Sequence, residues 1–412
     1  NVFKRVMQWA GFLLLSSVAW AQQAEVSGFI KDPVEAAVAN ARVTLQNVAT
    51  NGKQTVVSSN EGLYRFPSLP VGMYRATVEA QGFQTKVIDQ IQLTVDAKVT
   101  INVALEIGAT SQSVTVSGSG INVNTTDASV STVVSRQFVE NVPLNGRSFQ
   151  SLLTLVPGVS VVPSQGVSKS GELSVNGQRT EANYFTVDGV SVNTGAVSGE
   201  TGLGSGSGYS GSVPGLTALG TTQSLVSIDA LQEFRATTSS YSAEYGRTPG
   251  GQFSFTTRSG TNDWHGSLFE YFRNDVLDAT NWFDNADQLS KQAERQNDFG
   301  GTLGGQVRIP KLYNGRDRTF FFVSYEGLRL RSPQPAIVTA VPTLAVRQQA
   351  PTVLQPYLNA FPLPNGADLG NGTAYFISGY SNPSSLDATS VRIDHSFSDS
   401  FKIFGRYSDS PS

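Results

Sequence analysis

The residues best suited to chemistry in this 412-residue chain are few and scattered. Its two histidines, His265 and His395, lie far apart, and the chain contains no cysteine. A zinc site needs several histidine or cysteine ligands at short spacing, and a serine hydrolase needs a histidine base beside its nucleophile. The sequence therefore favours neither class of enzyme.

Three carboxylates and one glycine cluster also invite a catalytic interpretation. Glu233, Glu244 and Asp263 have no nucleophile or positioned partner nearby in the sequence, so solvated side chains are the better account. Gly300–Gly305 (GGTLGG) lacks the Lys-Ser/Thr that ends a phosphate-binding loop, and small residues that let strands approach closely explain it better. We expect no covalent catalysis, no cofactor and no metal.

Composition points to turn-rich β structure. The chain has 40 glycines and only 15% charged residues, which argues against long helices. Its 29 basic and 32 acidic residues give a net charge of −3 without a basic run, so we expect no nucleic-acid partner. The absence of cysteine fits either chance or an exported protein that needs no disulfides.

The first 21 residues have the pattern of a signal peptide. Lys4-Arg5 precede the apolar run 9–18 (WAGFLLLSSV), and Ala19 and Ala21 form an A-x-A cleavage site. The alternative is an amphipathic membrane anchor. The run is too short for a spanning helix of about 20 residues. Since no other long apolar run exists, we expect any membrane insertion to use β-strands.

Residues 22–106 predict a seven-stranded β-sandwich. Short alternating stretches are bounded by turn residues, with Tyr64, Phe66, Tyr74 and Val78 as core side chains. The expected strands are Glu25–Ile30, Asn40–Gln46, Gln54–Val57, Gly62–Phe66, Gly72–Val78, Ile91–Val95 and Val99–Leu105. The motif from Gly62 to Phe83 (GLYRFPSLPVGMYRATVEAQGF) resembles the carboxypeptidase regulatory-like domain. That resemblance implies a transthyretin-like or immunoglobulin-like fold and no peptidase activity.

Residues 123–260 predict a small α+β domain. Gln137–Val159 contains a helical face formed by Phe149, Leu152, Leu153 and Val156. Gln252–Arg258 alternates as a strand. The turn residues that punctuate this region are Pro143, Gly146, Pro157, Gly158, Asn176-Gly177 and Asp188-Gly189.

Residues 261–412 predict membrane-spanning strands. In Arg318–Arg331 (RTFFFVSYEGLRLR), Phe321, Val323 and Tyr325 alternate with Ser324 and Glu326. Such alternation with aromatic ends is typical of an outer-membrane barrel, with the aromatic side chains facing lipid. A second stretch alternates in the same way, with Phe401, Ile403 and Tyr407 against Lys402 and Arg406.

Motifs across these two regions resemble the TonB-dependent outer-membrane receptors, in particular their Oar-like branch. They are PLNGRSFQSLLTLVPGV, LSVNGQRTEANYFTVDGVSVN, IDALQEFRATTSSYSAEYGRTPGGQFSFTTRSGTNDWHGSLFEYFRN and RTFFFVSYEGLR. The resemblance implies a plug segment (residues 123–260) and the first strands of an incomplete barrel, the barrel segment (residues 261–412). It implies TonB-dependent active uptake of a nutrient across the outer membrane, with the N-terminal sandwich in the periplasm. The alternative is a cell-surface adhesion or carbohydrate-binding protein, which the sandwich alone would permit.

The resemblance also assigns roles to particular residues. Family plugs use internal charged residues to hold plug to barrel, which points here to ion pairs of Arg147, Arg179, Arg235 and Arg247. Residues 107–122 form a Gly/Ser-rich linker, in which Ser113-Val114-Thr115-Val116-Ser117 resembles a TonB box. The alternatives for this segment are a strand end of the preceding sandwich or plain linker.

Strand counting limits the barrel. Spanning strands need about 10 residues each, and outer-membrane transporters close at 22 strands. The region after Gly260 supplies five or six, and an open sheet would leave an unpaired edge in lipid. We therefore expect the chain to be the N-terminal fragment of a longer protein.

Overall fold

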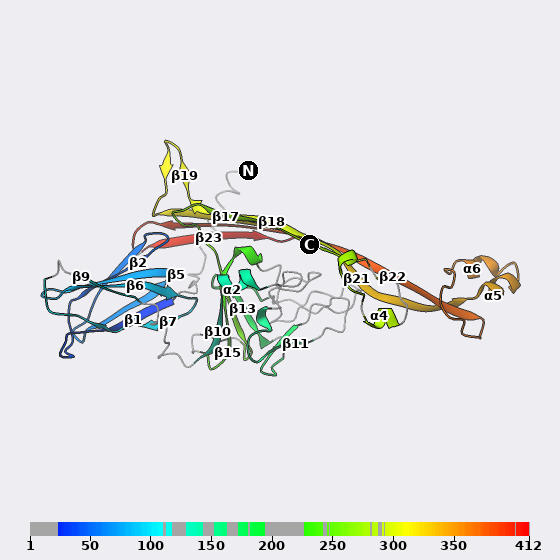
Figure 1. The fold of residues 1–412 in the computed structure, drawn as a ribbon, viewed down its shortest axis with the longest axis horizontal. Helices are drawn as coiled ribbons and strands as arrows, with labels where there is room; N and C mark the ends of the chain where they lie inside the picture. Colours follow the sequence, from blue (N-terminus) through cyan, green and yellow to red (C-terminus); the bar gives the residue numbers. More distant parts are fainter. Residues whose placement is uncertain are drawn as a thin grey trace, which may run out of the picture. The chain divides into compact units, whose positions relative to one another are not determined.

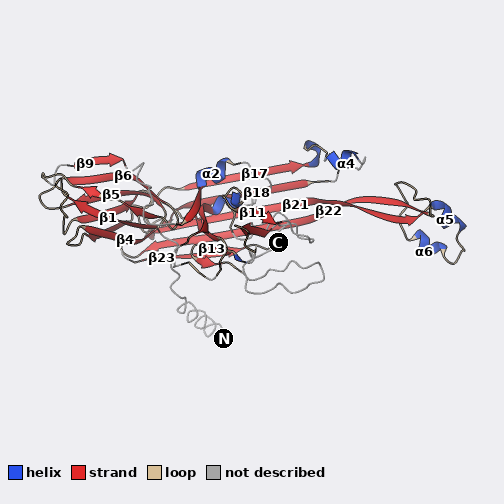
Figure 2. Cartoon of the chain, turned by 90° about the horizontal axis from the view of Figure 1, so that it is seen from below, coloured by secondary structure: helices blue, strands red, loops and turns tan. Residues whose placement is uncertain are grey.

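The computed structural model consists mainly of β-strands with a few short helices (Figures 1 and 2). It describes residues 24–109, 113–117, 129–142, 152–162, 172–179, 182–193, 226–241, 245–246, 248–280, 282–286, 291, 293–399 and 401–411. The expected signal peptide, with Ala19 and Ala21, lies outside these residues. The chain divides into two compact units, residues 1–267 with 301–325 and 388–410, and residues 268–300 with 326–387 and 411–412.

The N-terminal part is a sandwich of two sheets. One sheet has the order β4-β1-β7, with β8 also pairing β1, and the other has the order β3-β2-β5-β6-β9. The strands are β1 (Ala24–Lys31), β2 (Arg42–Asn47), β3 (Lys53–Val57), β4 (Leu63–Leu69), β5 (Gly72–Glu79), β6 (Thr85–Leu93), β7 (Lys98–Thr100), β8 (Val103–Ala104) and β9 (Ser113–Ser117). The expected sandwich is confirmed.

The sandwich core is made by the expected alternation. Tyr64, Phe66, Tyr74 and Val78 are all buried, at no more than 3% exposure. The Tyr64 hydroxyl donates to the carbonyl of Ile101 at 2.7 Å, so its one polar group is satisfied inside the core.

Two strands differ from the sequence expectation. β6 begins at Thr85 and ends at Leu93, whereas the sequence predicted only its end, displaced to Ile91–Val95. The expected strand Val99–Leu105 is broken into β7 and β8, both parallel to β1. The break has a local cause, because the Asn102 side chain replaces a backbone carbonyl and accepts from the amide of Phe29 at 3.0 Å.

Gly28 gives a stability prediction for the sandwich. A Cβ atom at this position of β1 would lie 1.9 Å from the carbonyl oxygen of Ile101, so the strands would have to move apart. We expect Gly28→Ala to destabilise the sandwich by about 1–3 kcal/mol, measured as a lower urea midpoint. Gly52→Ala, whose Cβ would meet its nearest atom at 3.4 Å, is the matched control. Equal midpoints for the two variants would contradict the prediction.

The plug segment contains a five-stranded sheet of order β10-β15-β16-β13-β14 and a separate pair β11-β12. Its elements are β10 (Val130–Ser135), α2 (Arg136–Asn141), β11 (Val159–Val162), β12 (Glu172–Val175), β13 (Tyr184–Val187), β14 (Val190–Ser191), η3 (Ile228–Ala230), β15 (Leu231–Ser239) and β16 (Gln252–Thr257). All six residues of β16 are buried, because it is a central strand covered on both faces. Its neighbour β13 runs parallel to it.

The helical expectation for the plug segment is met in part. The helix α2 spans only the first residues of the expected stretch. Leu152, Leu153 and Val156 are buried in the core of the plug segment, as the apolar face predicted. Phe149 lies outside the described residues.

The barrel segment is an open five-stranded sheet of order β17-β18-β21-β22-β23. Its elements are β17 (His265–Asn274), η4 (Asp275–Leu277), α4 (Trp282–Ala286), β18 (Arg295–Gln306), β19 (Arg308–Ile309), β20 (Tyr313–Asn314), β21 (Thr319–Pro342), α5 (Leu344–Gln349), α6 (Gln355–Asn359), β22 (Thr373–Ser396) and β23 (Lys402–Asp409). The long strands pair with their neighbours in sequence, and β19-β20 form a separate small hairpin. This is the up-and-down order that a barrel wall requires.

Candidate functional site: a plug aspartate between two barrel arginines

A tight turn in the plug segment sets the position of Asp188. β13 and β14 are joined by Asp188-Gly189, whose φ angles are 49° and 81°. Two consecutive positive φ values define the turn type that favours Asp-Gly in two-residue hairpins. The Asp188 amide donates to the carbonyl of Phe255 at 2.9 Å, which fixes the turn against β16.

The Asp188 carboxylate is buried and bonded within the plug segment. One oxygen accepts from the Thr257 amide at 2.9 Å, and the other accepts from the Thr257 hydroxyl at 2.8 Å. The side chain is only 5% exposed. A buried carboxylate of this kind still needs a balancing charge.

Two arginines of the barrel segment supply that charge. Arg392 of β22 approaches one Asp188 oxygen at 3.1 Å, and Arg406 of β23 approaches the other at 3.1 Å. The two arginines are register partners on adjacent strands, so their side chains leave the sheet on the same face. Both are largely buried, at 13% and 16% exposure.

Arg392 is held on its other sides as well. Its guanidinium pairs with Asp394 at 2.8 Å, donates to the Thr257 carbonyl at 3.2 Å, and lies 4.6 Å from the centre of the Phe404 ring. Two aspartates therefore balance two arginines in a water-poor site. The arrangement can hold the plug segment against the sheet.

A second buried cluster links the plug segment to the sandwich. Glu233 and Arg235 of β15 are 3% and 8% exposed. Glu233 accepts from the Val95 amide, while Arg235 donates to the carbonyls of Val95, at 3.1 Å, and of Asp96. Arg235 also donates to the Ser131 hydroxyl at 2.9 Å. The two side chains thus bind both polar groups of one backbone unit in the loop after β6.

Burial changes the titration of Glu233. Desolvation raises the pKa of this carboxyl from 4.5 to about 7, opposed in part by the Val95 amide and the charge of Arg235. Arg235 was expected to pair the plug with the barrel. The structure instead directs its guanidinium to the sandwich loop and to Ser131.

The segment that resembles a TonB box is an edge strand of the sandwich. β9 (Ser113–Ser117) pairs in parallel with β6, with Thr85 opposite Ser113 and Asp89 opposite Ser117. All five of its residues are exposed. The segment is therefore a separate strand of the sandwich sheet, whereas the alternative expected the end of a preceding strand.

The remaining site predictions fall into two groups. Gly158 has φ 84°, and a Cβ there would lie 2.2 Å from Asn176 Oδ1, so only glycine fits this contact. Asn176-Gly177 form a turn with φ 50° and 76°, Pro157 precedes Gly158 in the turn before β11, and the carbonyl of Arg179 accepts from the Ala182 amide. Pro143, Gly146, Arg147 and Arg247 lie outside the described residues.

Comparison with known families accounts for this layout. The model of the carboxypeptidase regulatory-like domain matches residues 25–106, that of the TonB-dependent receptor plug domain matches 122–252, and that of an outer membrane beta barrel domain matches 256–352. The chain thus carries a TonB-dependent receptor plug domain between a carboxypeptidase regulatory-like domain and an outer membrane beta barrel domain. As such it belongs to the outer membrane.

Each of the following relatives aligns with at least two thirds of this chain, but the aligned part is a third or less of the relative. The TonB-dependent transporter Oar of Myxococcus xanthus is 29% identical over 317 residues, which are 74% of this chain and 27% of the relative. The siderophore receptor PirA of Acinetobacter baumannii is 15% identical with a TM-score of 0.41, covering 68% of this chain and 31% of PirA. The ferric enterobactin receptor PfeA of Pseudomonas aeruginosa is 12% identical with a TM-score of 0.43, covering 69% and 33%. The chain thus spans about a quarter of the curated relative it matches.

The described residues contain neither a candidate metal cluster nor a candidate membrane helix. Within that part of the chain, no group of three or more histidine, aspartate or glutamate side chains is placed to hold a metal ion. No described helix is long and apolar enough to cross a membrane.

Sequence reasoning missed the two arginines that hold Asp188. Arg406 was noted as the polar partner of Phe401, Ile403 and Tyr407, which are 57%, 49% and 66% exposed. Arg392 lies in the same kind of pattern (VRIDHS) and was not singled out. The available signal was an arginine on the side of a barrel strand opposite its apolar residues.

Proposed function

We propose that the protein takes up a nutrient across the outer membrane and that TonB drives the movement of its plug. The observation that carries this proposal is the buried contact of Asp188 with Arg392 and Arg406. This contact joins the plug to the barrel through charged groups. When the plug shifts, water can solvate these groups, so the contact can break and form again. A plug held in this way can move and return without a covalent step.

We further propose that TonB engages the strand β9. A short exposed strand at a sheet edge is suited to pairing with a strand of a partner. None of its side chains is buried, so it gains little from the sandwich core. Parallel pairing is also slightly less stable per residue than antiparallel pairing. β9 can therefore leave β6 and pair with TonB instead.

A disulfide that locks β9 to β6 tests this role. Val87 and Thr115 are register partners, and neighbouring strands lie about 4.8 Å apart, within the range that a disulfide bridges. The chain contains no other cysteine. We expect the double variant Val87→Cys/Thr115→Cys to lose at least tenfold in binding to the periplasmic domain of TonB, with binding restored by a reductant.

Two controls separate the parts of the proposal. Thr44→Cys/Thr55→Cys places a disulfide between register partners at the other edge of the same sheet and should leave TonB binding intact. Deletion of Ser113–Ser117 should abolish TonB binding and uptake. If the deletion binds TonB normally, the segment is not the TonB box. If the deletion abolishes binding but the locked variant binds normally, TonB does not need β9 to leave β6.

A further inference from the structure

One arginine of the plug segment binds two separate parts of the chain at once. Arg235 of β15 donates to the carbonyl of Val95 at 3.1 Å and to that of Asp96, both in the sandwich loop 94–97. The same guanidinium donates to the Ser131 hydroxyl of β10 at 3.0 and 2.9 Å. These residues all belong to one compact unit. Since Arg235 is only 8% exposed, the sandwich loop and β10 share one buried cation.

β10 depends on its neighbour for its position. It is the edge strand of the five-stranded plug sheet and pairs with β15, where Val133 lies opposite Arg235 (Figure 1). Of the six residues of β10, only Val134 is buried. An edge strand with little buried apolar surface opens at a low cost in free energy. Side-chain contacts from β15 therefore contribute much of what holds β10 in place.

The sandwich loop presents its backbone polar groups in a fixed turn. Asp96 has φ 53°, a left-handed conformation that aspartate tolerates. The Ala97 amide donates to the carbonyl of Thr94 at 3.1 Å, and the Ala97 carbonyl accepts from the Glu25 amide of β1 at 2.8 Å. The turn is thus tied to the folded sandwich, and a movement of the sandwich carries the loop with it.

Glu233 completes the contact between the loop and β15. It stands two residues before Arg235, so the two side chains leave the strand on the same face, and its carboxylate accepts from the Val95 amide. A guanidinium already held by the loop has lost rotational freedom. Its bond to Ser131 therefore costs less further entropy than it would without the loop. Docking of the loop and pairing of β10 should favour each other.

We propose that the sandwich is a latch on the plug segment, in which docking of loop 94–97 on Glu233 and Arg235 fastens β10 to β15. The latch is a conformational device that needs no ligand. Because docking and strand pairing share Arg235, the release of either part weakens the hold on the other.

The latch acts at the start of the proposed transport movement, and this step alone rests on the proposed function. There, TonB pulls on β9. β10 is the next described strand after β9 along the chain, so it is the first strand of the plug sheet that the pull reaches. A docked sandwich raises the force needed to detach β10, and an undocked sandwich lowers it.

Hydrogen–deuterium exchange of the intact protein in detergent tests the latch. Val95→Pro removes the amide that donates to Glu233. We expect exchange of the β10 amides to rise at least about fivefold, the lower end of an ordinary coupling between two sites. The amides of the central strand β16 should exchange as in the wild type.

A second variant acts from the plug side of the contact. Arg235→Lys keeps the charge but loses the planar fork that reaches Ser131 and the loop carbonyls together. It should speed β10 exchange as Val95→Pro does. This variant decides the question if Val95→Pro unfolds the sandwich, which fast exchange of the β5 amides would reveal.

A double-mutant cycle shows whether the coupling runs through Arg235. Ser131→Ala removes the hydroxyl of β10 that accepts from Arg235 and leaves the loop contacts in place. In that background, Val95→Pro should change β10 exchange by less than about twofold, because the connection is already broken.

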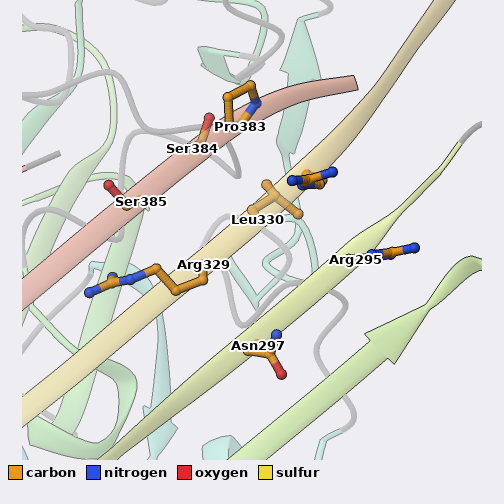
Figure 3. A pocket seen from close by; sticks show the side chains of 8 residues that line it. Arg295, Asn297, Arg329, Leu330, Pro383, Ser384 and Ser385 are labelled. Atoms are coloured by element: carbon orange, nitrogen blue, oxygen red, sulfur yellow. The ribbon is translucent and has the colours of Figure 1, made fainter. Parts of the chain in front are cut away.

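Two controls remove comparable groups elsewhere. Asn51→Ala removes a different hydrogen bond of the sandwich, from Asn51 Nδ2 to Asp317 Oδ1 at 3.1 Å. Arg329→Ala removes an arginine of the other compact unit, where Arg329 pairs with Asp387 at 2.9 Å and lines a hollow of about 420 Å³ (Figure 3). Both variants should leave β10 exchange unchanged.

The outcomes separate the latch from general loosening. Equal β10 exchange in the wild type, Val95→Pro and Arg235→Lys overturns the proposal. So does a comparable rise in Asn51→Ala, or an equal effect of Val95→Pro with and without the Ser131 hydroxyl. None of these measurements involves TonB, so a failure of β9 to bind TonB would leave them unchanged and would be detected separately.

Discussion

Replacement of Asp188 by alanine is expected to loosen the plug by about 3–5 kcal/mol, because it leaves two buried arginines without their shared counter-charge. Asp188 lies 3.1 Å from both Arg392 and Arg406 and is itself almost fully buried. The loss should appear as a lower melting temperature of the plug in scanning calorimetry. It should also raise passive entry of small antibiotics in cells that lack TonB.

The charge account of Asp188 can be separated from a packing account. Asp188→Asn keeps acceptor oxygen for Thr257 but removes the charge, so it should lose most of the same stability. Adding Arg392→Leu and Arg406→Leu to Asp188→Ala should recover part of the loss, since apolar replacement of a whole buried pair is often neutral. If Asp188→Asn melts at the same temperature as the wild type and leaves permeability unchanged, the charges do not hold the plug.

Plug stability should fall as the pH rises from about 4.5 to 7, because Glu233 binds its proton more tightly in the folded protein. Burial raises the pKa of this carboxyl to about 7. Below pH 4.5 the folded and unfolded states are both protonated, and the stabilising effect is fully present. As the pH rises, the unfolded state ionises first, and the advantage is lost through pH 7. A shift of this size corresponds to about 3 kcal/mol.

Glu233→Gln should remove that pH dependence. The amide remains an acceptor for the Val95 N–H but does not ionise. We expect the variant to be more stable than the wild type at pH 8 and similar to it at pH 4.5, measured by urea unfolding. Glu79→Gln, at an exposed position of the sandwich, is the control. An unchanged slope between pH 4.5 and 8 in Glu233→Gln would contradict the prediction.

The sequence was most informative where periodicity and turn chemistry act locally. The alternation around Tyr64 and Tyr74 predicted the sandwich core, and Asp188-Gly189 predicted a tight turn because few other residues adopt two positive φ angles. The alternation in β21 also agrees with burial, since Ser324 is 1% exposed and Tyr325 is 37% exposed. Each of these features depends on residues within a few positions of one another.

The contacts of the candidate site could not be predicted in the same way. Asp188 meets Arg392 across 204 positions, and Arg235 meets Asp96 across 139. Nothing local distinguishes Arg392 from other arginines that alternate with apolar residues. The turn at Asp188 could be predicted because it requires two positive φ angles. The role of the Asp188 carboxylate instead depends on which strands reach it in three dimensions.

The pairing of Arg392 with Arg406 has a consequence for assembly. The two residues stand opposite each other on β22 and β23, and like charges in such positions destabilise a strand pair. The Asp188 carboxylate removes that repulsion when the plug is folded and in place. We therefore expect β22 and β23 to pair stably only after the plug has folded. A barrel sheet without its plug should then form more slowly than one with the plug in place.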